Sequence, residues 1–273
     1  MLENPRSPRV RAVAKLAKRS ARAETGLFLL EGPQAVTEAL AYRPELLVDL
    51  FVTPTALERH PELTDAAQSA DLGITFVAED VLGSMADTVT PQGVVAVCRQ
   101  FPVALKEIFA AAPRLIAVLE EVRDPGNAGT IIRAADAAGV DAVILTGRTV
   151  DLYNPKVVRS TTGSLFHVPV AVSATLDDVR ARLVAAGVQL LAADIKGESL
   201  LDARVAGALA PASAWLFGNE ARGLSDEYLA IADRVISVPI YGLAESMNLA
   251  TAASVCLYES AFAQRSVEGT GRA

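Results

Sequence analysis

Residues 127–133 read NAGTIIR, residues 217–224 read FGNEARGL, and residues 239–250 read PIYGLAESMNLA. Each of these polar, glycine-containing blocks follows an apolar run that is typical of a buried strand, and the first and third lead into helical patterns. Open α/β sheets bind ligands in crevices beyond the carboxyl ends of their parallel strands. Three such blocks in one region therefore predict one composite site at the edge of a parallel sheet.

The second half of the chain alternates strands and helices around these blocks. The apolar runs predict strands at residues 115–119, 142–145, 189–193, 214–217 and 235–238. The helical patterns fall at residues 127–138, 155–162, 176–186 and 246–264. Alternation of this kind indicates an α/β fold, with a mainly parallel sheet covered by helices on both faces.

The first half is expected to form a smaller α/β unit. Helical spacing covers residues 10–22, and strands are expected at residues 28–31, 46–53, 74–78 and 94–100, with helices between them. The domain organisation predicted from these patterns is a basic N-terminal helix or arm at 1–25, an α/β domain at 26–101, a linker or bridging helix at 102–113, a larger domain at 114–265 and a tail at 266–273.

Bulk composition narrows the class of protein. The chain has 273 residues, of which 51% are hydrophobic, so it can bury a sizeable core. Because no apolar stretch reaches the length of a membrane span and the basic N-terminus lacks a following apolar block, we expect a soluble, cytoplasmic protein. Cys98 and Cys256 are expected to be buried thiols, and no cysteine or histidine cluster suggests a metal site.

Charge is distributed unevenly. The net charge is −7, yet residues 1–25 hold seven basic and two acidic groups, a local +5 that leaves −12 for the remainder. A basic arm on an acidic body indicates nucleic-acid binding, although a solvated helix or tail accounts for it equally well. The candidate RNA contacts are Arg9, Arg11, Lys15, Lys18, Arg19 and Arg22, and a second basic segment adds Lys156 and Arg159. His167 is expected to be a partly buried structural residue.

The first block combines a helix start with an arginine. We expect Asn127 to be the N-cap, with Gly129 permitting close backbone approach and Arg133 less than two turns into the helix. A helix N-terminus beside an arginine suits an anion, while an ordinary cap with a surface arginine is the simpler alternative. The block is not GxGxxG, so the usual dinucleotide fingerprint is absent.

The other two blocks also have simpler explanations. In the second, Asn219 and Glu220 suit hydroxyl or arginine binding, and Glu220 is placed to pair with Arg133; a tight turn is the alternative. In the third, Ser246 or Asn248 is expected to cap the last helix. Capping accounts for Ser246 better than for Asn248.

Taken in order, the motifs N-x-G-x-x-x-R, F-G-N-E-x-x-G-L and P-I-x-G-x-x-x-S-M-N-L-A resemble those of the SpoU (TrmH-like) family of RNA ribose 2′-O-methyltransferases, within the SPOUT superfamily. This resemblance covers about residues 114–264. The N-terminal unit resembles, less specifically, the ribosomal-protein-like substrate-binding domain of family members that act on ribosomal RNA. The best piece of that match is FLLEG at residues 28–32, followed by a helix.

The resemblance implies a fold, a cofactor and an assembly. It implies a deep trefoil knot in the C-terminal domain, bound S-adenosylmethionine, and a homodimer with the active site at its interface. The implied catalytic residues are Arg133, Asn127, Glu220, Ser246 and Asn248. The implied cofactor-binding residues are Gly218, Val238, Ile240, Met247, Leu249, Asp194 and Gly197. No metal is required.

The substrate follows only by analogy. The extra N-terminal domain favours large-subunit, 23S-type ribosomal RNA, with transfer RNA as the alternative. A non-catalytic RNA-binding or ribosome-assembly protein of the same fold is a further alternative. Because a guanidinium is a poor general base, we expect Arg133 to hold the 2′-oxygen and a phosphate, while the proton leaves through phosphate, Glu220 or water.

Overall fold

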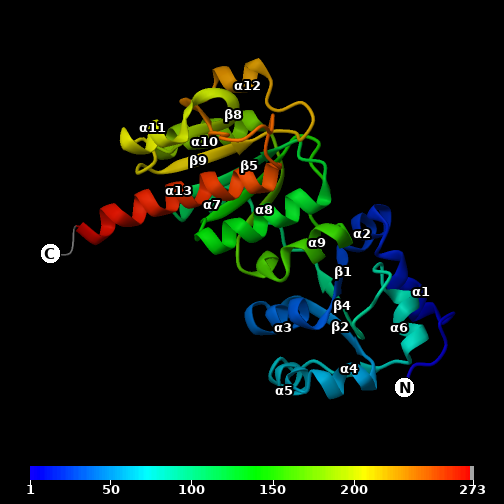
Figure 1. Ribbon diagram of the computed structural model, residues 1–273. Helices are drawn as coiled ribbons and strands as arrows, with labels where there is room; N and C mark the ends of the chain where they lie inside the picture. The colour runs from blue at the N-terminus through cyan, green and yellow to red at the C-terminus, as the bar shows by residue number, and fades with distance from the viewer. Residues whose placement is uncertain (271–273) are drawn as a thin grey trace. The chain divides into compact units, whose positions relative to one another are not determined.

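The computed structural model describes residues 1–270 and the side chains of residues 1–266. The chain forms two compact units (Figure 1). The first comprises residues 1–101 and 151–167, and the second comprises residues 102–150 and the chain from residue 168 onward. The chain therefore passes between the units three times, at residues 101–102, 150–151 and 167–168.

The first unit is built on a four-stranded mixed sheet of order β1-β4-β2-β3. Strand β4 is antiparallel to both β1 and β2, whereas β2 and β3 are parallel. The strands are β1 (Leu27–Glu31), β2 (Leu47–Val52), β3 (Ile74–Phe76) and β4 (Val94–Arg99). The helices are α1 (Pro8–Lys15), α2 (Arg19–Thr25), α3 (Pro33–Tyr42), α4 (Pro54–Arg59), α5 (Glu62–Ser69), α6 (Glu79–Met85) and α9 (Pro155–Thr161), with short 3-10 turns η1 (Pro44–Leu46) and η2 (Ser164–Phe166).

The N-terminal basic segment is part of this core. Val10, Val13 and Leu16 recur at helical spacing and are buried together with Val77 and Val81. Residues 1–25, for which the sequence predicts a separate helix or arm, therefore fold as α1 and α2 onto the unit itself. The apolar stripe of α1 explains why these residues do not form a separate arm. The stripe is shielded from water when α1 packs on the first unit.

Residues 151–167 also pack in the first unit, although the sequence places them within the larger domain. The rings of Tyr153 and Phe28 lie 4.8 Å apart, and Phe166 stacks on Phe101 at 5.7 Å. Gly163 has φ +103°, and a Cβ there would lie 2.5 Å from Glu38 Cγ. These long-range contacts have no local signature in the sequence.

The second unit contains a six-stranded sheet of order β10-β8-β9-β5-β6-β7 in which every strand pair is parallel. The α/β fold with a parallel sheet that the sequence predicts is therefore confirmed. The strands are β5 (Leu115–Glu120), β6 (Ala142–Thr146), β7 (Val170–Ala174), β8 (Gln189–Ser199), β9 (Ser213–Phe217) and β10 (Arg234–Ser237). The helices are α7 (Leu105–Ala110), α8 (Pro125–Ala138), α10 (Leu176–Ala186), α11 (Leu200–Val205), α12 (Asp226–Ala230) and α13 (Leu249–Thr270).

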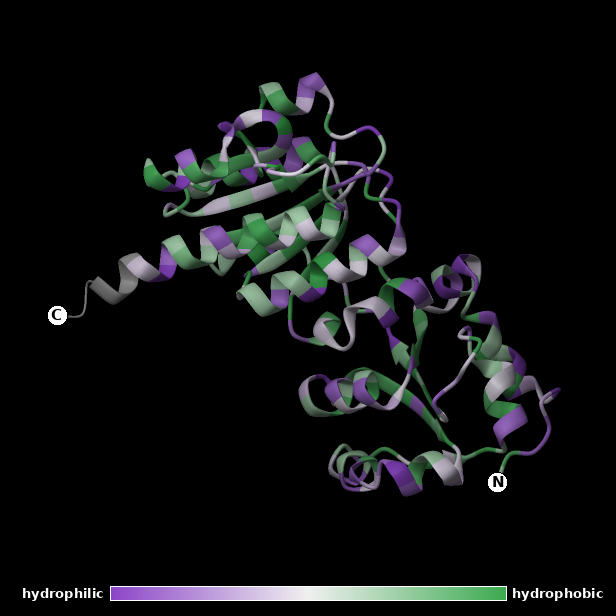
Figure 2. Ribbon diagram, in the orientation of Figure 1, coloured by the Kyte–Doolittle hydropathy of each residue, from purple (hydrophilic) through white to green (hydrophobic). Residues whose placement is uncertain are grey.

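Alternation along β9 separates two faces of this sheet. Ala214 and Leu216 belong to a core that includes residues of α7 and α10. Trp215 faces the other way, and its Nε1 donates to Ser260 Oγ on α13 at 2.8 Å. Figure 1 shows α8 and α13 side by side on this second face, and Figure 2 shows largely hydrophobic strands between the helices. Since α7 contributes Ile108 to the core, residues 102–113 are more than a linker.

Both cysteines are buried and unbonded, as predicted. Burial raises the pKa of the Cys256 thiol to about 12 and that of Cys98 further. Among the residues that the structure describes, no helix is both long and apolar enough to cross a membrane. Of the predicted tail at 266–273, residues 266–270 continue α13, and residues 271–273 lie outside the described part.

Candidate active site

Helix α8 begins two residues earlier than the sequence predicts. Asp124 is the N-cap, Pro125 occupies the first helical position, and the Asp124 carboxylate accepts from the Asn127 backbone N–H at 2.8 Å. Proline suits the first helical position because a backbone N–H there would have no intrahelical acceptor, so its absence costs no hydrogen bond. Asn127 is therefore not the cap, and its side chain is left for other contacts.

A chain of hydrogen bonds joins the three sequence blocks. Asn127 Nδ2 donates to Glu220 Oε1 at 3.3 Å, and Asn248 Nδ2 donates to Asn127 Oδ1 at 2.9 Å. Asn248 Oδ1 in turn accepts from the backbone N–H of Ala250 at 2.9 Å. Asn248, and not Ser246, therefore caps α13, and both ends of its amide are used.

The carboxylate of Glu220 is held by hydrogen-bond donors at the start of α8 and just before it. Besides Asn127, its carboxylate accepts the backbone N–H groups of Arg123 at 3.2 Å and Asp124 at 3.0 Å. The pairing with Arg133 suggested by the sequence is not formed. These donors fix the orientation of the carboxylate.

Arg133 points away from this network. It lies six residues after Asn127, which is about 240° around the helix axis. Its side chain is exposed, does not line the cavity described below, and forms no hydrogen bond or ion pair with any residue the structure describes. The structure thus brings Asn127, Glu220 and Asn248 together and leaves Arg133 outside the group.

These polar groups border a cavity of about 620 Å³. The predicted site residues that line it are Asn127, Asp194, Glu220, Val238, Ile240, Ser246, Met247, Asn248 and Leu249. One wall is apolar and the rim is polar, a combination typical of a site for one small organic molecule.

Two predicted glycines lie where backbone segments meet closely. A Cβ at Gly218 would lie 2.6 Å from the carbonyl carbon of Gly223, and a Cβ at Gly197 would lie 2.4 Å from that of Val235. Neither glycine lines the cavity, but both permit the close approach of the loops that do. Strand β8 also runs on to Ser199, beyond the strand predicted at residues 189–193, so Asp194 and Gly197 lie within it.

Sequence reasoning missed several lining residues. Lys196, Phe217, Arg222 and Leu224 also face the cavity. Three of them lie inside the quoted block at 217–224, but nothing in the spacing distinguishes them from turn residues.

A buried carboxylate lies just before the site. Glu120, the last residue of β5, is buried, and its Oε2 has no hydrogen-bond partner among the described residues. Burial raises the pKa of its carboxyl, and the charge of Glu121 adds to the shift. In the described residues, no cluster of histidine, cysteine and acidic side chains could hold a metal.

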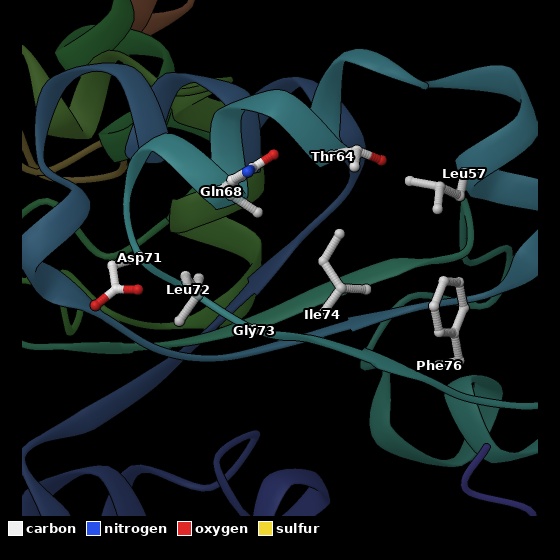
Figure 3. Close-up of a pocket in the computed structure, with 9 residues that line it drawn as sticks. Leu57, Thr64, Gln68, Asp71, Leu72, Gly73, Ile74 and Phe76 are labelled. Carbon is white, nitrogen blue, oxygen red and sulfur yellow. The ribbon is translucent and has the colours of Figure 1, made fainter.

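A second hollow, of about 420 Å³, lies in the first unit between α5 and β3 (Figure 3). Leu57, Leu72, Ile74 and Phe76 give it an apolar lining, and Asp71 is its one carboxylate. None of the predicted site residues faces it, so it is not the candidate active site.

The predicted RNA-binding residues divide into two groups. Arg9 pairs with Asp49, and Arg159 binds Glu31 at 2.6 Å and Asp87 at 3.0 Å. Arg22 is buried and binds Asp151 at 2.6 Å and two backbone carbonyls, so its guanidinium is used inside the unit. The exposed remainder comprises Arg11, Lys15, Lys18, Arg19 and Lys156.

His167 is half-buried, as the sequence predicts. It lies 3.2 Å from Glu38 and packs on Tyr42.

The fold and the cavity define a parallel α/β protein with a small-molecule site beyond its strand ends. Residues 114–258 match the model of the SpoU rRNA Methylase family, and residues 7–96 match an MRM3-like substrate binding domain. The chain belongs to the SpoU rRNA methylase family, which confirms the resemblance seen in the motifs.

Individual relatives extend over nearly the whole chain. A 23S rRNA guanosine 2′-O-methyltransferase of Bacillus subtilis, RlmP, is 33% identical and covers 94% of this chain and 97% of its own. A 23S rRNA uridine 2′-O-methyltransferase of Streptomyces viridochromogenes is 31% identical over 90% of this chain and 86% of its own. The AdoMet-bound crystal structure of an rRNA methyltransferase from Sinorhizobium meliloti aligns with a TM-score of 0.82 at 32% identity, covering 95% of this chain and 96% of that one.

Proposed function

We propose that this protein transfers a methyl group from S-adenosylmethionine to a ribose 2′-hydroxyl of 23S-type ribosomal RNA. The observation that carries the proposal is the hydrogen-bonded chain Glu220–Asn127–Asn248 at the rim of a small-molecule cavity. It unites the three motifs into one site. The similar proteins named as 23S rRNA 2′-O-methyltransferases support the substrate, which in turn favours action in the cytoplasm.

The cavity suits the cofactor. Its volume of about 620 Å³ fits a nucleoside-sized molecule, and Val238, Ile240, Met247 and Leu249 provide an apolar surface for a flat base. Asp194 at the rim supplies a carboxylate for a hydroxyl or ammonium group. When bound, S-adenosylmethionine supplies an activated methyl group.

The chain's own residues provide alignment. Asn127 is held on both sides by Glu220 and Asn248, so the polar rim is ordered before the substrate arrives. Such preorganisation can supply several kcal/mol of the barrier reduction. Ser246 is exposed at the cavity and offers a hydroxyl that can donate to or accept from the ribose.

We also propose a homodimer in which Arg133 acts on the cavity of the other protomer. Arg133 is exposed and lies outside the cavity of its own chain, so a second copy would bring a guanidinium to the site. There it would hold the 2′-oxygen and stabilise developing negative charge, because a guanidinium stays protonated and is a poor general base. We further propose that the segments around the cavity form a trefoil knot.

Methyl transfer tests the reaction and the substrate together. Purified protein is incubated with labelled S-adenosylmethionine and unmodified ribosomal RNA, with transfer RNA in parallel, and any label is mapped. We expect label at one 2′-hydroxyl of ribosomal RNA, abolished in Arg133→Ala with cofactor affinity retained. Label only in transfer RNA would overturn the substrate, and no cofactor binding would leave the non-catalytic alternative ahead. Near-normal turnover in Arg133→Lys would contradict the role of the guanidinium geometry.

Mixing two inactive variants tests the dimer. Arg133→Ala and Asn127→Ala, mixed after reversible dissociation, would form heterodimers in which one site carries both changes and the other carries neither. If Arg133 acts across a twofold interface, activity should recover to about one quarter of the parent level. No recovery, although heterodimers are present, would place Arg133 at its own cavity.

A further inference from the structure

Three arginines surround one carboxylate at the sheet edge of the second unit. Arg222 Nη2 lies 2.6 Å from Glu121 Oε2, Arg123 Nη2 lies 3.4 Å from the same oxygen, and Arg148 Nε lies 3.8 Å from Oε1. We call these four residues the Glu121 arginine cluster. Sequence reasoning assigned none of them a function.

The sheet order brings these residues together. Strands β9, β5 and β6 are neighbours, and the three arginines follow their carboxyl ends. Glu121 comes directly after the central strand of the three. Its carboxylate therefore contacts Arg123 from its own loop, Arg148 from the loop after β6 and Arg222 from the loop after β9.

The backbone is constrained to present Glu121 in this way. Its φ is +50°, a left-handed conformation that is strained for any residue other than glycine. Its N–H donates to the carbonyl of Thr146 at 3.2 Å, and its own carbonyl accepts from Asn219 Nδ2 at 2.9 Å. Gly147 adopts φ +62°, and a Cβ there would lie 3.0 Å from Glu121 Cγ. The neighbouring loops thus hold the strained residue in place.

The cluster gathers guanidinium groups on an acidic chain. Within its four residues three guanidinium groups outnumber one carboxylate, and the carboxylates of Glu120 and Glu220 lie beside it, whereas the chain as a whole carries −7. The side chains of Arg123, Arg148 and Arg222 are 53%, 87% and 65% exposed. Each guanidinium has five N–H donors, and only part of each set is directed at Glu121. Donors remain for a second, external anion.

The cluster adjoins the candidate active site. The backbone N–H of Arg123 donates to Glu220, and Arg222 lines the cavity. We propose that the Glu121 arginine cluster binds a backbone phosphate of the RNA next to the nucleotide that is methylated, with Glu121 as the positioning residue. The identity of the anion as RNA rests on the proposed function. Guanidinium groups suit this task because their planar forks bind phosphate bidentately.

RNA binding at several salt concentrations tests this site. The variants are Arg148→Gln and Arg123→Gln/Arg148→Gln, which leave the cavity-lining Arg222 in place, and the probe is an unmodified ribosomal RNA fragment. Each lost phosphate contact lowers the slope of log K against log salt by about 0.7–0.9. Because the cluster is proposed to bind one phosphate, the double variant should lose about 0.7–0.9 from the slope and bind about tenfold more weakly at low salt, with AdoMet affinity and unfolding temperature unchanged.

The matched control for Arg148→Gln is Arg182→Gln, an exposed arginine on α10, because each of these single variants removes one positive charge. A slope in the double variant equal to that of the parent, or an equal loss per charge in Arg182→Gln, would overturn the phosphate site. Methyl transfer by the parent is scored separately. A parent that binds RNA through the cluster but transfers no methyl would overturn the proposed function and leave the phosphate site standing.

Discussion

The two units use arginine in opposite ways. In the first, Arg159 forms ion pairs with two carboxylates, Glu31 and Asp87, and Arg22 is buried with only 3% of its side chain exposed. In the second, one carboxylate, Glu121, holds three exposed arginines. The N-terminal segment has the larger excess of basic residues, yet part of that charge is consumed within the fold.

This comparison shows that the number of basic residues in a segment does not predict where positively charged groups are available to a ligand. A guanidinium bonded inside a unit contributes stability and specificity, whereas one that shares a carboxylate with others retains donors for a ligand. The same contrast holds for carboxylates, since Glu31 binds an arginine and two backbone N–H groups while Glu120 keeps an oxygen without a hydrogen-bond partner among the described residues.

The largest effect is expected for Arg22→Ala. The substitution leaves the Asp151 carboxylate and two carbonyls without their donor, and removing one partner of a buried pair costs about 3–5 kcal/mol. Chemical denaturation measures the free energy of unfolding. The exposed neighbour Arg19→Ala should change it by less than about 0.5 kcal/mol. Equal values for the two variants would break the contrast between structural and surface arginines.

Next comes Gly218→Ala, which tests whether the second unit needs its close backbone approach. The added Cβ would meet the backbone of Gly223 at 2.6 Å and displace the loop at residues 217–224. We expect AdoMet affinity, measured by calorimetry, to fall by tenfold or more, about 1.4 kcal/mol. Gly242→Ala is the matched control, since a Cβ there meets nothing within 4 Å. An undiminished affinity in Gly218→Ala would refute the role of this contact.

A smaller effect is expected for Glu120→Gln. Because burial raises the pKa of this carboxyl, the folded state holds the proton more tightly than the unfolded state. The parent is therefore favoured below the unfolded pKa of about 4.5 and loses stability as pH rises through the folded pKa. Glu120→Gln should remove this loss, so the variant should unfold at a higher denaturant concentration than the parent at neutral pH. A pH profile identical to that of the parent would show that Glu120 does not titrate in this range; Glu107→Gln, on the surface, is the control.

The smallest effect concerns backbone strain at Glu121. Glu121→Gly and Glu121→Ala both remove the carboxylate, but only alanine retains the cost of φ +50°. We expect the glycine variant to be the more stable by about 0.5 kcal/mol, after its greater unfolded-state entropy is counted. An alanine variant as stable as the glycine variant would mean that the loop relaxes and that the strain is not retained.

Most of the second unit was predictable. The apolar runs gave the strands of its sheet except β7, and the motif order gave the family and with it the cofactor. Strand β7 was missed because Val170–Ala174 is short and adjoins Pro169, and α11 and α12 are single-turn helices with little periodicity. The helix starts were misassigned for a related reason, since Asp124 and Asn127 are both good caps and only the position of Pro125 in the folded helix decides between them.

The sequence by itself determined the α/β class, a smaller α/β region followed by a larger one, and the polar residues Asn127, Glu220 and Asn248 at the cavity, because these follow from periodicity and motif order along the chain. Only the tertiary structure decided how those residues are used. It placed Asn248 against Asn127, turned Arg133 away from the cavity, buried Arg22 beside Asp151 and gathered three arginines around Glu121. Each of these outcomes depends on residues distant in sequence that the sheet and its loops bring together, and no local pattern encodes that proximity.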